Sequence, residues 1–184
     1  MSVTAFSFPT NIQFGAGARR LVAAHLREAG YQRPLLVTDK ALATLPVLDE
    51  FKTHLEDLDV AVFSGVFGNP TTSQVMAGAV AFIGHRADCI IGFGGGAALD
   101  VAKLVGVAAT HTGDIIEYAW DHPAVRAIEH PLPYLVALPT TAGTGSEVGR
   151  ASVISEDDSH LKRVIFNPKI LAKYVCADPE LTLS

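Results

Sequence analysis

Three consecutive glycines, Gly94, Gly95 and Gly96, separate an apolar run from a segment with helical periodicity. At the start of a helix the first N–H groups lack partners within the helix and the helix dipole is positive, which suits a phosphate. Glycine has no Cβ, so a phosphate can approach the backbone closely. A turn that merely allows tight packing is the alternative, and a glycine triplet alone does not separate the two. The position between a strand and a helix favours phosphate binding, although the spacing differs from G-x-G-x-x-G.

A second loop, residues 139–147, follows another apolar run and is rich in glycine and in hydroxyl groups. The hydroxyls of Thr140, Thr141, Thr144 and Ser146 can each donate and accept hydrogen bonds. A helix cap formed by Thr144 or Ser146 would explain part of this composition, but not four hydroxyls. The loop is therefore predicted to fold around a small ligand.

Two further strand ends carry polar side chains. Asp39 ends the apolar run LLVTD, where an acid can accept from an adenosine ribose and repel a 2′-phosphate. A helix cap before the following KALA is an equally weighted interpretation of Asp39. Asn69 and Thr71, in GNPTT, are candidates for the same edge, although a turn followed by a cap is the favoured interpretation there.

Asp100 and Lys103 lie one helical turn apart in the segment after the glycines. This spacing alone favours an ion pair on a solvated helix face, worth a few tenths of a kcal/mol. The functional alternative is that Asp100 orients the loop or contacts a cofactor while Lys103 holds it in place.

The order of apolar runs and helical patterns predicts an α/β fold with a mostly parallel, Rossmann-like sheet covered by helices on both faces. Buried strands are expected at 35–39, 59–63, 87–93 and 134–139. Helices are expected at 18–30, 46–58, 73–85 and directly after the glycines. Shorter strands are expected at 4–8, 11–14, 151–155, 162–166 and 171–178. We expect a single domain, residues 1–184, because no linker or repeat divides the chain.

Composition excludes several other classes. With 184 residues and 49% hydrophobic residues the chain can bury a sizeable core. The net charge is -5 and the lysines are dispersed, so no nucleic-acid partner is expected. No run approaches the ~20 apolar residues of a membrane span, and no leader is apparent, so no membrane partner is expected. Cys89 and Cys176 lie in apolar runs, which indicates free thiols and a cytoplasmic location. The histidines show no metal-ligand spacing.

Together these loops resemble the iron-dependent (group III) alcohol dehydrogenase family, within the dehydroquinate synthase-like superfamily. The resemblance spans nearly the whole chain in the family's order, and its combination of a glycine motif with a hydroxyl motif is highly specific. The matching stretches are FPTNIQFGAGA, LLVTD, NPTT, GFGGGAALDVAK, ALPTTAGTGSEV and ADPELTLS.

The resemblance implies an N-terminal domain that binds NAD, with NADP less expected because of Asp39. By this analogy Gly95, Gly96 and Ala97 face the pyrophosphate and Asp39 the adenosine ribose. Ala97 stands where the family commonly has serine, which implies weaker phosphate binding. Gly149 stands where threonine is frequent. The other implied cofactor contacts are Thr140, Thr141 and Thr144 near the adenine, and Lys162 near the nicotinamide ribose.

In the family a helical C-terminal domain supplies an aspartate and three histidines to Fe2+ or Zn2+, and it begins just after the stretch that resembles DPELTLS. The resemblance thus implies a hydride transfer between an alcohol or aldehyde and NAD(P) by the full-length protein. We expect the 184-residue chain to hold the cofactor but no metal, and to be catalytically incomplete by itself. We also expect a homodimer, with Leu181 and Leu183 left exposed to promote association. The alternatives are a stand-alone nucleotide-binding or regulatory module without chemistry, and a structural role in which the N-terminal strands pair between copies.

Overall fold

The computed structural model describes residues 10–183, and its centre is a six-stranded sheet in which every pair of neighbours is parallel. The strand order across the sheet is β1-β8-β5-β4-β2-β3. The strands are β1 (Asn11–Phe14), β2 (Pro34–Asp39), β3 (Ala61–Val66), β4 (Cys89–Gly94), β5 (Tyr134–Pro139) and β8 (Tyr174–Ala177).

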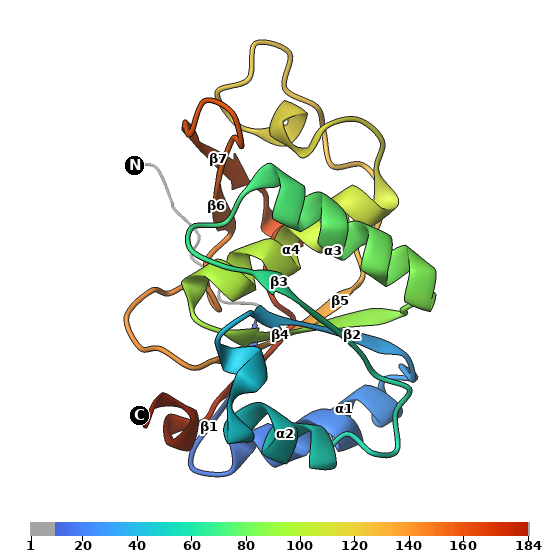
Figure 1. Ribbon diagram of the computed structural model, residues 1–184. Coiled ribbons are helices and arrows are strands. Elements are labelled where there is room, and N and C mark those ends of the chain that lie inside the picture. Colours follow the sequence, from blue (N-terminus) through green and yellow to red (C-terminus); the bar gives the residue numbers. More distant parts are fainter. Residues whose placement is uncertain (1–9, 184) are drawn as a thin grey trace, which may run out of the picture.

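Within residues 10–183, four α-helices cover the two faces of the sheet. Figure 1 shows α3 and α4 on one face and α1 and α2 on the other. They are α1 (Val22–Glu28), α2 (Pro46–Thr53), α3 (Thr72–His85) and α4 (Gly96–Thr110). The short 3-10 helices are η1 (Ala18–Leu21), η2 (Leu42–Thr44), η3 (Ile115–Tyr118), η4 (Pro168–Ile170) and η5 (Pro179–Thr182). The predicted Rossmann-like α/β architecture is confirmed.

The two faces have separate cores because side chains alternate along each strand. Leu35 and Ile90 pack with α3 and α4, whereas Leu36 and Ile91 pack with α1 and α2. Strands β2 and β4 lie inside the sheet and are buried on both faces, which explains their continuous apolar sequences. The predicted strand at 59–63 differs: it forms the edge strand β3, which begins at Ala61, and Val62 is exposed.

Two of the short predicted strands leave the main sheet. β6 (Ala151–Ser155) and β7 (Lys162–Phe166) pair with each other in an antiparallel hairpin. The side of β6 that carries Ser152 lies against α4, where the Ser152 hydroxyl donates to the Asp100 carbonyl oxygen at 2.9 Å. The hairpin therefore rests on the first turns of α4.

An ion-pair cluster joins the C-terminal segment to η1 and α2. Arg19, next to α1, contacts Glu50 of α2 at 3.0 Å, and Asp178 and Glu180 of the C-terminal segment at 2.7 Å each. This segment keeps Leu181 buried, so the expected exposure of Leu181 is wrong, while Leu183 is 79% exposed as expected. The strand predicted at 4–8 lies outside the described residues.

The chain reverses its path through the sheet between β2 and β4. After β2 it moves outward to β3 with α2 on one face, and after β4 it moves toward β5 with α4 on the opposite face. The segments that leave β2 and β4 therefore diverge and leave a crevice at the carboxyl ends of these strands, which is where open α/β sheets bind ligands.

Candidate nucleotide-binding site

The glycine turn, residues 94–96, lies at this crevice. Gly94 ends β4 with a φ of +150°, and a Cβ there would lie 2.7 Å from the Cβ of Ala98, so the fold itself requires glycine at this position. Gly95 precedes α4 in an extended conformation and makes no side-chain cap, and the first intrahelical bond is donated by Leu99. The N–H groups of Gly96, Ala97 and Ala98 thus have no carbonyl partner within the helix.

The hydroxyl loop, residues 139–147, runs beside the glycine turn. The N–H of Thr140 donates to the Gly94 carbonyl at 3.0 Å. A Cβ on Gly95 would lie 3.5 Å from Thr141 Oγ1, and one on Gly96 would lie 3.2 Å from the side chain of Thr144. No helix begins in this loop, so the helix-cap interpretation is wrong; instead Thr144 Oγ1 accepts from the Ser146 N–H. The structure brings the two predicted loops together.

Asp39 holds the turn after β2, and its contact with a ribose stays a prediction. Its Oδ1 accepts from the Leu42 N–H at 2.8 Å and so caps the turn after β2. Its Oδ2 faces the glycine turn, since a Cβ on Gly94 would lie 3.4 Å from that oxygen. One carboxylate oxygen thus holds the local backbone, and the other faces the crevice.

A pocket of about 610 Å³ occupies the crevice and is called here the β2–β4 pocket. This volume is within the range of small-ligand sites. Its lining combines Asp39 and Lys40 with backbone of the glycine turn and with apolar side chains. The lining residues are Asp39, Lys40, Ala41, Thr44, Val66, Phe67, Gly68, Gly95, Ala97 and Ala98.

Asp100, Lys103 and Ser146 form a buried polar network behind the glycine turn. Lys103 is 3% exposed, and its Nζ donates to Ala151 O at 2.8 Å and to Ser146 Oγ at 3.2 Å, and lies 3.4 Å from Asp100 Oδ1. The Ser146 hydroxyl also donates to Asp100, whose Oδ2 accepts from the Val153 N–H. Burial lowers the pKa of Lys103, and the charge of Asp100 opposes this effect.

This network corrects the interpretation of Asp100 and Lys103 as a solvated surface pair. Three separate segments meet at it: the start of α4, the hydroxyl loop and β6. Asp100, Lys103 and Ser146 therefore hold the start of α4, the hydroxyl loop and β6 in register. That Asp100 and Ser146 also contact a cofactor stays a prediction.

The remaining predicted site residues lie farther out. Thr71 caps α3, its side chain accepting from the Gln74 N–H, as the cap interpretation predicts. Asn69 is exposed in the same loop, and Lys162 is exposed at the start of β7. Among residues 10–183, neither makes a side-chain hydrogen bond that would orient it toward the glycine turn. Their cofactor roles stay predictions.

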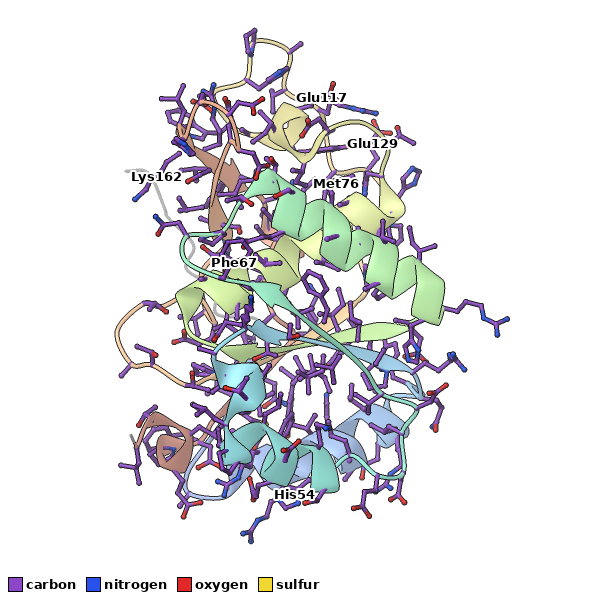
Figure 2. All side chains as sticks on the ribbon, in the orientation of Figure 1. His54, Phe67, Met76, Glu117, Glu129 and Lys162 are labelled. Atoms are coloured by element: carbon purple, nitrogen blue, oxygen red, sulfur yellow. The ribbon has the colours of Figure 1, made fainter. Side chains whose placement is uncertain are left out.

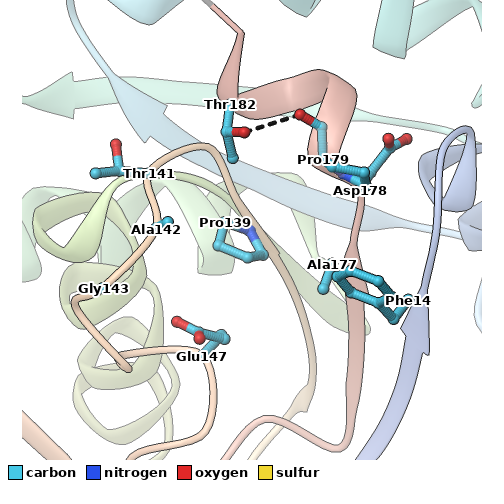
Figure 3. A pocket seen from close by; sticks show the side chains of 10 residues that line it. All are labelled: Phe14, Pro139, Thr141, Ala142, Gly143, Glu147, Ala177, Asp178, Pro179 and Thr182. Carbon is cyan, nitrogen blue, oxygen red and sulfur yellow. Dashed lines mark hydrogen bonds between the residues drawn. The ribbon is translucent and has the colours of Figure 1, made fainter.

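A second pocket, of about 260 Å³, lies on the far side of the hydroxyl loop, at the ends of β5, β8 and β1. Figure 3 shows Phe14 beside Ala177 on one side and the segment with Thr141 and Gly143 on the other. Its lining includes the 82% exposed Phe14. The hydroxyl loop thus separates two pockets along one edge of the sheet.

The cysteines and the metal-ligating residue types add no second site. Cys89 and Cys176 are buried free thiols, and burial raises the pKa of Cys176 to about 12. Within residues 10–183, no three His, Cys, Asp or Glu side chains form a group that could hold a metal ion. The described residues therefore do not fit a metal centre. Within the same residues, no helix is long and apolar enough to cross a membrane.

Comparison with known proteins identifies the family. The model for iron-containing alcohol dehydrogenases matches residues 9–179. The chain belongs to this family. The glycine turn and the hydroxyl loop both fall inside the matched region.

The relatives are dehydrogenases about twice as long. The chain is 38% identical over 174 residues to a 1,3-propanediol dehydrogenase of Citrobacter freundii, covering 92% of this chain and 44% of the relative. It is 36% identical to a 4-hydroxybutyrate dehydrogenase of Cupriavidus necator, covering 95% of this chain and 45% of the relative. The chain spans about half the length of the curated relatives it matches, and corresponds to their N-terminal half.

Solved structures of the family share this fold. A 1,3-propanediol oxidoreductase superposes with a TM-score of 0.89 at 35% identity, covering 97% of this chain and 47% of the other. A sulfoacetaldehyde reductase from Bifidobacterium kashiwanohense, solved in complex with NAD+, superposes with a TM-score of 0.91 at 26% identity, covering 99% of this chain and 48% of the other.

Seven residues that line the β2–β4 pocket were not predicted from the sequence, and three of them, Lys40, Thr44 and Phe67, have polar or aromatic side chains. Lys40 was detectable, because it directly follows Asp39 at a strand end. Phe67 offered a weaker signal, as an aromatic residue in a loop between Val66 and Gly68. No sequence signal pointed to Thr44, because only the turn capped by Asp39 brings this residue to the pocket.

Proposed function

We propose that residues 1–184 form the nicotinamide-cofactor-binding domain of a metal-dependent alcohol dehydrogenase. The observation that carries the proposal is the crevice at the carboxyl ends of β2 and β4, where the glycine turn lies between Asp39 and the hydroxyl loop. An anion is favoured at the start of α4, and a sugar hydroxyl can donate to Asp39 Oδ2. Membership of the iron-containing alcohol dehydrogenase family supports the same conclusion.

In this proposal the pyrophosphate receives hydrogen bonds from the N–H groups of Gly96 and Ala97. Gly94 and Gly95 let it approach the backbone, and Asp39 accepts from the adenosine ribose. The other proposed cofactor contacts are Asn69, Asp100, Thr140, Thr141, Thr144, Ser146 and Lys162. The hydroxyl loop limits the site on the side of β5 and fixes the direction in which the cofactor leaves the glycine turn.

The cofactor is proposed to be NAD, with NADP disfavoured by Asp39. A relative named NAD-dependent methanol dehydrogenase, from Bacillus methanolicus, supports this choice. When bound, the nicotinamide ring supplies the hydride acceptor or donor for an alcohol or aldehyde. Because the described residues lack a metal-ligand group, we assign Fe2+ or Zn2+ to other parts of the full-length protein. We expect the 184-residue chain to bind NADH but to oxidise no alcohol.

We further propose that the protein is cytoplasmic and forms a homodimer. The two buried free thiols are consistent with a reducing compartment. Strand β1 is at the edge of the sheet, where its one described partner is β8, and such an edge can pair with another copy.

Calorimetric titration with NADH tests the binding proposal. The Gly95→Ala variant places a methyl group in the pocket without strain, because φ at Gly95 is −74° and the nearest atom is 3.5 Å away. Gly84→Ala is the matched control, since a Cβ at Gly84 meets nothing within 4 Å. We expect NADH to bind the wild-type chain and Gly84→Ala equally, and Gly95→Ala at least about tenfold more weakly, or 1.4 kcal/mol. A wild-type chain that gives no heat with NADH would contradict the proposal.

A further inference from the structure

The outer side of α3 exposes apolar side chains and no charged one. Val80 is 70% exposed, Ile83 58% and Met76 39%. The other exposed residues of this helix are Ser73, Ala77 and Gly84. These six positions recur with the helical period, so they lie along one side of the helix, called here the α3 stripe. Figure 1 shows α3 in front of α4, and Figure 2 labels Met76 on its N-terminal half.

Such a stripe is unusual for the water-facing side of a surface helix. A helix that covers a sheet normally turns polar and charged residues to water. The centres of protein interfaces, by contrast, are depleted in charged residues and enriched in methionine. The composition of the α3 stripe therefore indicates a contact with another protein surface.

The shape of the α3 stripe suits a second copy of the same helix. Met76, Val80 and Ile83 form a ridge, and the small residues Ala77 and Gly84 leave room beside it. Helices pack by placing the ridge of one into the groove of the other. Since α3 runs from Thr72 to His85, two antiparallel copies with coincident centres place Val80 of each copy opposite Ala77 of the other.

An acidic group lies at the N-terminal end of α3. Asp157, from the turn between β6 and β7, accepts from the Ser73 N–H at 2.8 Å and from the Ser73 hydroxyl at 2.6 Å. Hydrogen bonds from Ser73 and Thr72 lower the pKa of Asp157 to about 2, so this exposed carboxylate is ionised at neutral pH. Asp158 is exposed beside it.

A basic group lies at the opposite end of the helix. Arg86 directly follows α3, and its N–H donates to the Ile83 carbonyl at 2.9 Å, which fixes its backbone. Its side chain is exposed and makes no ion pair or hydrogen bond with other residues of the range 10–183. Antiparallel pairing of two copies brings Arg86 of each toward Asp157 of the other. A surface that is acidic at one end and basic at the other is thus complementary to itself about a two-fold axis.

We propose that α3 pairs with α3 of a second copy of this chain, antiparallel across a two-fold axis. This inference goes beyond the proposed function, because it uses neither the cofactor crevice nor the edge strand β1. One helix from each copy makes a contact at the low end of interface sizes, so the association is weak and depends on protein concentration. Where the β1 edges pair as well, each copy has two different contacts and the assembly is larger than a dimer.

Sedimentation equilibrium of the 184-residue chain over a wide range of concentrations tests this pairing. The wild-type chain should associate as its concentration rises. Val80→Glu should weaken the association at least about tenfold, because it places a charge from each copy at the centre of the contact. The matched control is Val125→Glu, which makes the same change at a 55% exposed valine outside the α3 stripe and should alter the association less than about twofold.

A second variant tests the antiparallel direction. Arg86→Glu removes two symmetry-related surface ion pairs and should weaken the association about 2- to 30-fold. Added salt should weaken the association of the wild-type chain, because it screens these pairs, and should have a smaller effect on Arg86→Glu. Far-UV circular dichroism checks that each variant keeps its fold.

The outcomes separate this inference from the proposed function. If Val80→Glu associates as strongly as Val125→Glu, the pairing through α3 is overturned, while cofactor binding and pairing through β1 are untouched. Weakening by Val80→Glu without any weakening by Arg86→Glu would overturn the antiparallel arrangement. A wild-type chain that stays monomeric at every concentration overturns this inference and the proposed homodimer, but not the binding of NADH, which calorimetry measures on the same sample.

Discussion

Replacement of Lys103 by methionine tests whether a buried cation holds the start of α4, the hydroxyl loop and β6 together. Methionine keeps most of the length and the apolar stem of lysine but removes the ammonium group. The three oxygens near Nζ, on Ala151, Ser146 and Asp100, then lose their donor. The carboxylate of Asp100, whose side chain is 16% exposed, loses its neutralising charge.

The expected loss of stability follows from these contacts. Removing one partner of a buried ion pair typically costs 3–5 kcal/mol, because the other charge stays buried. Asp100 keeps hydrogen bonds from the Ser146 hydroxyl and the Val153 N–H, so we expect the lower end, about 3 kcal/mol. For a domain of this size that is a fall of roughly 6–12 °C in Tm.

Urea unfolding followed by far-UV circular dichroism measures this loss. Lys162→Met is the matched control, since Lys162 is exposed, and it should change the free energy of unfolding by less than about 0.5 kcal/mol. The double variant Asp100→Asn/Lys103→Met should lose less than the sum of its single variants, because it removes both charges. A Lys103→Met variant that loses no more stability than Lys162→Met, or two single losses that are additive, would contradict this role of Lys103.

Three further predictions concern the glycine turn, cofactor choice and acid stability. Gly94→Ala should lower the free energy of unfolding by at least about 1 kcal/mol, because φ is +150° and the new Cβ would lie 2.7 Å from the Cβ of Ala98. Urea unfolding should show a much smaller change for Gly95→Ala, and equal losses would contradict the assigned geometry. Asp39→Gly should gain NADPH affinity about tenfold or more, because it removes a negative charge that repels the 2′-phosphate and leaves Lys40 in the pocket. Calorimetry that shows no gain in NADPH affinity would remove Asp39 from the ribose site. Burial alone would raise the pKa of Asp178, but hydrogen bonds from Arg19 outweigh burial and lower the pKa. The ionised carboxylate therefore stabilises the fold above its unfolded pKa of about 3.9, and this stabilisation is lost as the pH falls through the folded pKa. Arg19→Met should flatten this acid dependence in urea unfolding at a series of pH values, and an unchanged slope would contradict the assignment.

The elements of the fold were predictable because each has a local cause. The buried strands β2, β4 and β5 are continuous apolar runs, and the helices between them show helical periodicity. The pairing of the strands was harder to predict from the sequence, because it depends on residues far apart in the chain. The antiparallel pairing of β6 with β7 and the position of β3 at the sheet edge both follow from what packs nearby, which no local pattern records.

The same distinction applies to the site. The glycine turn was predictable because glycine between a strand and a helix has a direct backbone consequence, and Gly94 does adopt a φ that favours glycine. The role of Lys103 in holding Asp100 was only the less favoured alternative, because its other partners, Ser146 and Ala151, are 43 and 48 residues away. Spacing within a helix identified the nearby Asp100 but gave the wrong environment, a solvated surface instead of a buried network.

A crystal structure of the 184-residue chain grown with NAD+ would show whether the glycine turn binds the cofactor. We expect pyrophosphate oxygens within about 2.7–3.2 Å of the Gly96 and Ala97 amide nitrogens, with the adenosine ribose at Asp39. A glycine turn without bound phosphate, or a pyrophosphate in the pocket beside Phe14 and Ala177, would contradict it.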